Sequence, residues 1–198
     1  MALGRRITVL ASALAAAASG SAPGQDRAVR LFAQGGGYTA VKDVNTIGAQ
    51  FKTGFALGGG VGYEVTDNIE LRATLTGAQS QLLDNGSGTG VYLNRYYVAA
   101  DFKAGYAAAG GITPYGIIGV GGVFLHEKGT TGANKTQGFA HLGFGIAYAV
   151  GKSGLSIFAQ GDGLFYSLSG MTSPAFARFS ATQTDVGWSA GASYKLTL

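Results

Sequence analysis

The segment from Thr66 to Gly77 alternates between apolar and polar residues, as a β-strand with two different faces does. Its apolar positions are Ile69, Leu71, Ala73 and Leu75. Its polar positions are Glu70, Arg72, Thr74 and Thr76. The same alternation suits a soluble barrel with an apolar core and a membrane barrel with an apolar exterior. The pattern alone therefore leaves open which face points inward.

Similar alternation recurs along the chain from Asp26 onward, without a helical period. The predicted strands are 28–39, 53–65, 68–79, 95–107, 113–125, 138–150, 155–165 and 184–198. Short connections alternate with longer, more polar ones, which are expected over 40–52, 80–94, 126–137 and 166–181. This strict alternation predicts an all-β, eight-stranded antiparallel up-and-down barrel with four long loops at one end.

A tyrosine repeats at the end of every second predicted strand. The four residues are Tyr63, Tyr106, Tyr148 and Tyr194. Their separations are 106−63=43, 148−106=42 and 194−148=46 residues, the length of one hairpin unit. All four lie in the apolar phase of their strands, and a tyrosine ring with its polar hydroxyl suits the boundary between hydrocarbon and headgroups. We expect these residues to form one interface girdle.

The polar faces of the strands carry mainly small residues, with a few charges of both signs. The charges expected to meet inside the barrel are Glu70, Arg72, Asp101, Lys103, Asp162, Asp185 and Lys195, with Arg30 and Glu64 as further candidates. Glu70 and Arg72 are expected to meet charges such as Asp101 and Lys103. The narrow interior of an eight-stranded barrel suits small polar residues and paired charges. This favours a polar interior and an apolar exterior. Segment 113–125 is apolar in both phases, so its orientation stays open.

The composition supports a membrane barrel. Only 12% of the 198 residues are charged, against roughly 25% in soluble domains. No apolar run reaches the roughly 20 residues that a membrane helix needs. The formal charge of +4 falls to about +2 without Arg5 and Arg6, and no basic-aromatic patch indicates a nucleic-acid partner.

The first residues have the pattern of a signal peptide. "MALGRR" is basic, "ITVLASALAAAA" is apolar, and the small residues of "SGSAPG" follow. Residues 1–22 are the expected signal peptide, with cleavage after Ala22 or Ala18 and a cleavage range of 18–25. A short N-terminal helix of the mature fold is the alternative. The remaining residues 26–198 are expected to form one barrel domain.

Three segments carry a family resemblance: "GYEVTDNIELR", "TPYGIIGVGGVF" and "SAGASYKLTL". With them the chain resembles the small OmpA/OmpX-like outer-membrane β-barrel proteins of Gram-negative bacteria. The resemblance implies the outer membrane as location, its lipid and lipopolysaccharide as surroundings, and recognition by the barrel-insertion machinery. The residues that match the insertion signal are Ser189, Gly191, Tyr194 and Leu196. The usual signal ends in an aromatic residue, whereas this chain ends in Leu198.

Little catalytic chemistry is visible. His126 and His141 are the only histidines, no motif singles out a nucleophile, and neither a metal site nor a cofactor is expected. We therefore expect a monomeric, non-enzymatic protein that serves envelope integrity and surface interaction.

The long loops are expected to carry this interaction, with lipopolysaccharide phosphates or with a host or surface ligand. The basic residues assigned to these loops are Lys42, Lys52, Lys128, Lys135 and Arg178. The alternatives are a narrow channel for small or apolar solutes, a lipid-modifying enzyme that uses the two histidines, and a soluble lipocalin-like binder.

Overall fold

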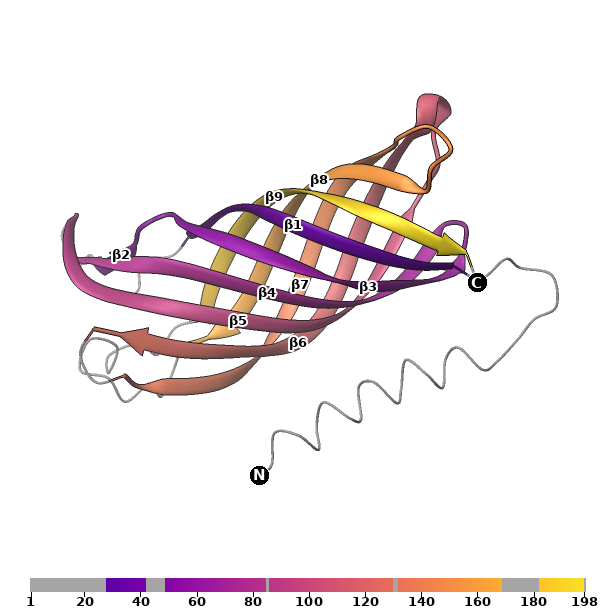
Figure 1. The fold of residues 1–198 in the computed structure, drawn as a ribbon. Coiled ribbons are helices and arrows are strands. Elements are labelled where there is room, and N and C mark those ends of the chain that lie inside the picture. The colour runs from indigo at the N-terminus through magenta and orange to yellow at the C-terminus, as the bar shows by residue number, and fades with distance from the viewer. Residues whose placement is uncertain (1–27, 42–48, 85, 130–131, 169–181, 198) are drawn as a thin grey trace.

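The computed structural model describes residues 28–41, 49–84, 86–129, 132–168 and 182–197, which form mainly β-strands (Figure 1). The strands are β1 (Ala28–Ala40), β2 (Ala49–Phe51), β3 (Gly54–Thr66), β4 (Ile69–Asp84), β5 (Ser87–Gly105), β6 (Ile112–Lys128), β7 (Asn134–Ala149), β8 (Leu155–Ser167) and β9 (Thr182–Thr197). A short 3-10 segment, η1 (Ala109–Gly111), joins β5 to β6. Within the described ranges, no helix is long and apolar enough to cross a membrane.

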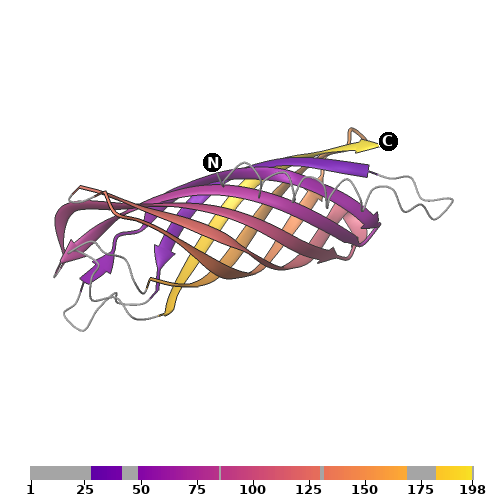
Figure 2. The ribbon, with the colours of Figure 1, turned by 90° about the horizontal axis from the view of Figure 1, so that it is seen from below.

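The eight long strands close into one antiparallel barrel (Figure 2). Each long strand pairs with the next along the chain, and β1 pairs with β9 to close the ring. β2 is a short extra strand paired with the far part of β4. The predicted eight-stranded up-and-down architecture is confirmed.

The strands are strongly staggered around the ring. Direct register partners, followed once around from Ala28, are Glu64, Glu70, Lys103, Ile117, Gly143, Asp162, Gly187 and then Tyr38. The path returns to β1 displaced by 38−28=10 residues. Such a stagger is linked to strand tilts of roughly 35–45° and to a narrow interior filled by side chains.

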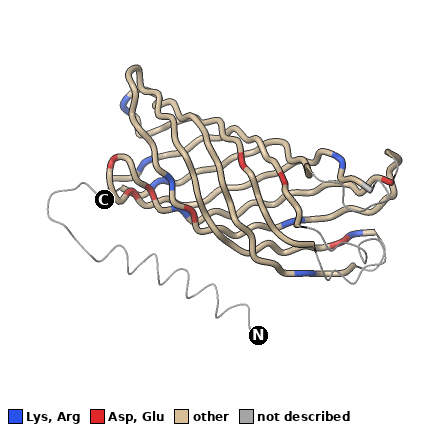
Figure 3. The backbone as a smooth tube through the Cα atoms, turned by 180° about the vertical axis from the view of Figure 1, so that it is seen from behind, with Lys and Arg blue, Asp and Glu red and all other residues tan. Residues whose placement is uncertain are grey.

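The barrel has an apolar exterior and a largely polar wall inside. On β4, Leu71 is 37% exposed while its neighbour Arg72 is only 4% exposed. Leu75 is also exposed and Glu70 is buried, so β4 orients both faces as predicted. Charged positions gather toward the two ends of the barrel, with few between them (Figure 3).

The structure settles the orientation of β6, which its sequence leaves open. Tyr115 and Ile117 are buried in the lumen, whereas Ile118 and Val120 are exposed on the outside. Both faces of β6 are apolar because its outer face meets the exterior and its inner face contributes Val123 and Leu125 to a buried apolar cluster.

Two of the four long loops predicted from the sequence, 80–94 and 126–137, are shorter than predicted because the strands extend into them. β4 continues to Asp84 and β5 starts at Ser87, so strand occupies most of the predicted loop 80–94. Likewise β6 continues to Lys128 and β7 starts at Asn134 within the predicted loop 126–137. Inward apolar residues continue the alternation here, and Gly86, at φ 79°, supplies the positive φ of a tight hairpin. The residues of "DNGSGTG" are typical of turns, so the alternation of the extended strands is not evident there in the sequence.

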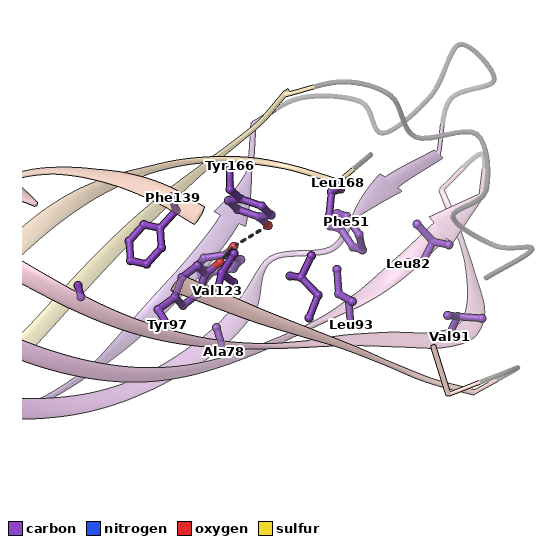
Figure 4. Close-up of a cluster of buried hydrophobic side chains, with 13 residues drawn as sticks. Phe51, Ala78, Leu82, Val91, Leu93, Tyr97, Val123, Phe139, Tyr166 and Leu168 are labelled. Atoms are coloured by element: carbon purple, nitrogen blue, oxygen red, sulfur yellow. Dashed lines mark hydrogen bonds between the residues drawn. The ribbon is translucent and has the colours of Figure 1, made fainter. Parts of the chain in front are cut away.

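The two ends of the barrel differ. At the turn end, tight connections join β3 to β4, β5 to β6 and β7 to β8. At the opposite, extended end, β4, β5 and β6 project farther than the other strands and enclose an apolar cluster (Figure 4). Its labelled members at this end include Phe51, Leu82, Val91, Leu93 and Leu168. The lumen is therefore covered by packed side chains at the extended end.

Candidate functional site in the barrel lumen

Six charged side chains form a cluster near the turn end. They are Arg30, Glu64, Glu70, Arg72, Lys103 and Lys195. The Glu70 carboxylate lies 2.6 Å from Arg72 Nε and 3.1 Å from Lys103 Nζ. The Glu64 carboxylate lies 2.5 Å from Arg30 Nη2 and 2.6 Å from Lys195 Nζ. Each enclosed carboxylate thus has at least two cationic partners, which makes its burial tolerable.

His141 bridges two aspartates in the middle of the lumen. Its Nδ1 lies 2.8 Å from Asp101 Oδ1, and its Nε2 lies 2.9 Å from Asp162 Oδ1. The Thr74 hydroxyl donates to Asp101 over 2.7 Å, and the Gln160 amide donates to Asp162 over 2.7 Å. Because both ring nitrogens face carboxylate oxygens, an imidazolium with two N–H donors satisfies the cluster. Neither nitrogen is available to take a proton from a nucleophile.

A third polar cluster lies toward the extended end around a fully buried ion pair. Arg95 and Asp185 are both 0% exposed, with Arg95 Nε 3.8 Å from Asp185 Oδ2. Arg95 Nε donates to the Tyr166 hydroxyl over 2.9 Å. The hydroxyl groups of Tyr38 and Tyr97 both donate to Asp185. Three tyrosines therefore surround one buried ion pair.

A cavity of about 60 Å³ lies between these clusters and is lined by residues from all eight long strands. Phe32 and Arg72 bound it toward the turn end, and Tyr97 and Phe139 bound it toward the extended end. The Arg72 guanidinium lies 4.7 Å from the centre of the Phe32 ring. The Tyr97 and Phe139 rings meet edge to face at 5.3 Å. Packed aromatic rings thus fill the lumen on both sides of the cavity.

Two polar atoms in the cavity wall are buried without a hydrogen-bond partner in the described part of the chain: Gln34 Oε1 and Ser189 Oγ. Across the cavity lie the polar groups around His141. A space of this size holds a few water molecules, and the unpaired atoms supply polar partners for them. The cavity can hold water or a very small solute.

Glycines make room for the large side chains in the lumen. Four aromatic residues lie directly opposite a glycine on the neighbouring strand and cover it. The pairs are Phe32 with Gly60, Tyr115 with Gly145, Phe139 with Gly121, and Phe158 with Gly191. The small residues expected on the polar faces are present, and the space beside these glycines is taken by aromatic rings. An interior this narrow can hold rings only where the opposite residue lacks a side chain.

The expected charge network divides into separate clusters. Glu70, Arg72, Lys103 and Lys195 join the cluster near the turn end, together with the further candidates Arg30 and Glu64. Asp101 and Asp162 bind His141, and Asp185 pairs with Arg95. Arg72 is the direct register partner of Asp101, but its Nε contacts Glu70 whereas Asp101 turns to His141. The expected meeting of Glu70 with Lys103 is present.

The four tyrosines of the expected girdle lie near the turn end. Tyr106, Tyr148 and Tyr194 are exposed on the outside, and Tyr63 is partly buried. Tyr63 pairs with Val29, and Tyr194 pairs with Leu31, so both lie beside the first residues of β1. We call these four residues the turn-end ring.

A second set of exposed aromatic residues lies farther toward the extended end of the barrel. It consists of Phe55, Tyr96, Phe124 and Phe165, and we call it the extended-end ring. Tyr96 on β5 and Tyr106 just after β5 are 106−96=10 residues apart. At roughly 3.3 Å per residue and a tilt of about 40°, the two rings are about 25 Å apart along the barrel axis. An apolar band of this height matches a transmembrane barrel.

The residues of the expected insertion signal divide between the two faces of β9. Tyr194 and Leu196 are exposed on the outside, whereas Ser189 lines the cavity. Gly191 faces inward, where it lies under the Phe158 ring. The two hydrophobic residues of the signal therefore share the apolar exterior.

The two histidines lie on opposite faces of the barrel wall. His141 is buried in the lumen, whereas His126 hydrogen-bonds Asn134 on the exposed side over 2.7 Å. The structure thus does not bring them together as one reactive site. Among the described residues, no group of three or more His, Cys, Asp or Glu side chains is arranged to hold a metal ion.

Sequence reasoning missed His141 as the centre of a cluster and missed the tyrosines around Asp185. The strand phase places Arg95, Tyr97 and Asp101 together on the polar, inward face of β5, and all three are buried. It does not show which side chains of other strands they contact. The contact between β5 and β9 across the barrel gives no local signal in the sequence.

No protein-family model matches the chain, and no curated protein matches its sequence. Its fold is similar to several solved structures. Neisserial surface protein A (NspA) has a TM-score of 0.58 and 14% identity, covering 86% of this chain and 97% of that one. A major outer membrane protein from Thermus thermophilus has a TM-score of 0.61 and 15% identity, covering 87% of this chain and 100% of that one.

The N-terminal β-barrel domain of Pseudomonas aeruginosa OprF has a TM-score of 0.53 and 16% identity, covering 85% of this chain and 97% of that one. The similarity thus extends over nearly all of the barrel in each comparison. It confirms the expected resemblance in fold, at a sequence identity of only 14% to 16%. The chain has the fold of the small eight-stranded outer-membrane β-barrels.

Proposed function

We propose that the protein resides in the outer membrane of a Gram-negative bacterium as a monomeric barrel. The apolar exterior and the two aromatic rings about 25 Å apart support this location. In this proposal residues 1–22 direct export and are removed, and the insertion machinery recognises Ser189, Gly191, Tyr194 and Leu196 on the last strand. The turn end then faces the periplasm and the extended end faces outward.

We further propose a non-enzymatic role in envelope integrity and surface interaction. The observation that carries this proposal is the filled lumen, in which aromatic rings and ion clusters occupy both sides of a small cavity. Such an interior gives a stiff anchor without an open pore. His141, with both nitrogens bound to carboxylates, offers no general base.

The extended end is the proposed interaction surface. β4, β5 and β6 project beyond the extended-end ring over their own apolar cluster, which gives the projection a rigid core. Lys52 and Lys128 are exposed there and can meet lipopolysaccharide phosphates or an acidic surface ligand. Lys135 lies on β7, whereas Lys42 and Arg178 lie outside the described residues.

Two measurements test this function. Loss of the protein should make cells more sensitive to detergents and large antibiotics, and the complete barrel should restore resistance. In planar bilayers the purified barrel should give no large, stable conductance. Restored resistance by a chain that fails to enter the outer membrane would contradict the anchor role, and a large stable current would contradict the closed lumen.

Passage of small or apolar solutes is the second candidate, favoured by the cavity in the middle of the lumen. It requires the rings on one side of the cavity to move apart. Uptake of small alcohols into vesicles containing the barrel, faster than into empty vesicles, would support this function over the first.

A further inference from the structure

Four polar side chains form a straight row on the outside of the barrel, across β4, β5, β6 and β7. They are Gln79, Asn94, His126 and Asn134. Each is the direct register partner of the next, so the row crosses the four strands without a step. The Gln79 amide donates to Asn94 Oδ1 over 2.7 Å, and His126 Nδ1 lies 2.7 Å from Asn134 Oδ1. We call these four residues the amide row.

The neighbouring rows place the amide row at a sharp change of polarity. Toward the turn end, the next outward row contains Tyr96 and Phe124, which belong to the extended-end ring and are direct register partners. Toward the extended end, the next row contains Tyr92 and Lys128, also register partners. The surface therefore passes from aromatic to amide to basic within three rows.

The surroundings of the amide row follow from the proposed outer-membrane location, on which this inference rests. The rings of Tyr96 and Phe124 mark the edge of the hydrocarbon, so the next row outward faces the headgroup layer of the outer leaflet. The row carries no formal negative charge, and Lys128 adds a cation beside it. Phosphate alone would be bound by a cluster of Arg and Lys side chains.

The chemistry of the row matches hydroxyl groups. An amide side chain has both donor and acceptor atoms, so Asn94 and Asn134 keep hydrogen-bonding capacity after forming the contacts within the row. Tyr92 and Tyr96 are exposed on either side of the row, and the apolar face of a sugar can pack against an aromatic ring. We infer that the amide row binds the phosphorylated sugar headgroup of an outer-leaflet glycolipid, with the amides on sugar hydroxyls and Lys128 on a phosphate.

Native mass spectrometry of the purified mature barrel tests this inference with three lipids. Lipid A carries sugar and phosphate, monoglucosyl diacylglycerol carries sugar alone, and phosphatidic acid carries phosphate alone. The barrel should bind lipid A most tightly and the glucosyl lipid more tightly than phosphatidic acid. Phosphatidic acid bound as tightly as lipid A would overturn the inference.

Variants of the row separate the roles of its residues. Asn94→Ala with Asn134→Ala should weaken binding of both sugar lipids about tenfold, because several hydrogen bonds are lost. Lys128→Gln should weaken binding of lipid A, which carries phosphate, and leave binding of the glucosyl lipid unchanged. The matched control is Thr39→Ala with Thr53→Ala, which removes another exposed hydrogen-bonded pair at the same end of the barrel. Equal losses in the row variant and this control would contradict a specific site.

A measurement on the unaltered barrel makes the test independent of variant folding. The side-chain amide signals of Asn94 and Asn134 should shift in NMR spectra when monoglucosyl diacylglycerol is added, and those of buried Gln160 should not. Absence of a shift in a correctly inserted barrel would overturn the site while leaving the proposed location intact.

Discussion

Asp101 reaches His141 across Gly119. Gly119 is the direct register partner of both residues, and a Cβ atom at this position would collide with Asp101 Oδ1. Gly143 lies two residues after His141 on β7 and is the register partner of Asp162, whose Oδ1 would lie 2.7 Å from an added Cβ. Because these two glycines have no side chain, both aspartate carboxylates have room to reach the His141 imidazole.

Gly119→Ala should therefore separate Asp101 from His141 and lower the free energy of unfolding by about 1–3 kcal/mol, as overpacking does. Urea unfolding in detergent, followed by heat-modifiable gel migration, measures this change. Gly122→Ala on the same strand is the control, because its nearest neighbour would be Gln137 O at 4.0 Å. Equal stability of the two variants would show that the room left at Gly119 is not needed.

His141→Ala should lower the free energy of unfolding by about 3–5 kcal/mol, because it leaves two enclosed carboxylates without their shared partner. Adding Asp101→Asn and Asp162→Asn to this variant should recover part of the loss by removing the charges. A triple variant no more stable than His141→Ala would contradict the proposed charge balance. Equilibrium unfolding of all three proteins gives the comparison.

Conductance should respond only when the lumen is opened on both sides of the cavity. Tyr97→Ala with Phe139→Ala clears rings toward the extended end, and Phe32→Ala with Phe158→Ala clears them toward the turn end. Either pair alone should leave planar-bilayer currents small, since the other layer remains. All four changes together should give a larger current than either pair, limited by the apolar cluster that still covers the extended end. A large current from one pair alone would show that the other layer is no barrier.

An arginine placed on the outer wall should lower the free energy of unfolding, and it should do so more strongly the deeper it lies in the membrane. Ile118 is 60% exposed and lies midway along β6 between Ile112 and Phe124. In lipid, Ile118→Arg should lower the free energy of unfolding by roughly 2–4 kcal/mol. Leu155→Arg, beside the turn-end ring, should lower it by roughly 0–1 kcal/mol. Unfolding of both variants in lipid vesicles measures the difference. Equal costs at the two positions would mean that the wall does not face hydrocarbon.

Strand alternation was enough to predict the barrel, because each face of a strand meets only one kind of surroundings. The face of β4 that carries Leu71 was assigned correctly for this reason. β6 could not be oriented from its sequence, since apolar side chains occupy both its inner face, as at Ile117, and its outer face, as at Ile118. The extensions of β4 and β5 were hidden by glycine and serine residues, which are typical of loops but also form hairpins.

The luminal clusters were less predictable than the fold. Asp101 and His141 both lie on inward faces of their strands, but their contact depends on the stagger between β5, β6 and β7. It also depends on Gly119, whose role is visible only once its two register partners are known. Single-strand patterns therefore identify luminal residues without identifying their partners.

Trp188 tests the central claim most directly. It is the only tryptophan of the chain, lies 63% exposed on the outside of β9, and stands 194−188=6 residues from Tyr194 in the turn-end ring. At roughly 3.3 Å per residue and a tilt of about 40°, this places it about 15 Å inside the apolar band. Its fluorescence in vesicles should be quenched strongly by lipids brominated along the acyl chain and little by aqueous iodide. Strong quenching by iodide with none by brominated lipid would contradict a barrel whose apolar face meets the membrane.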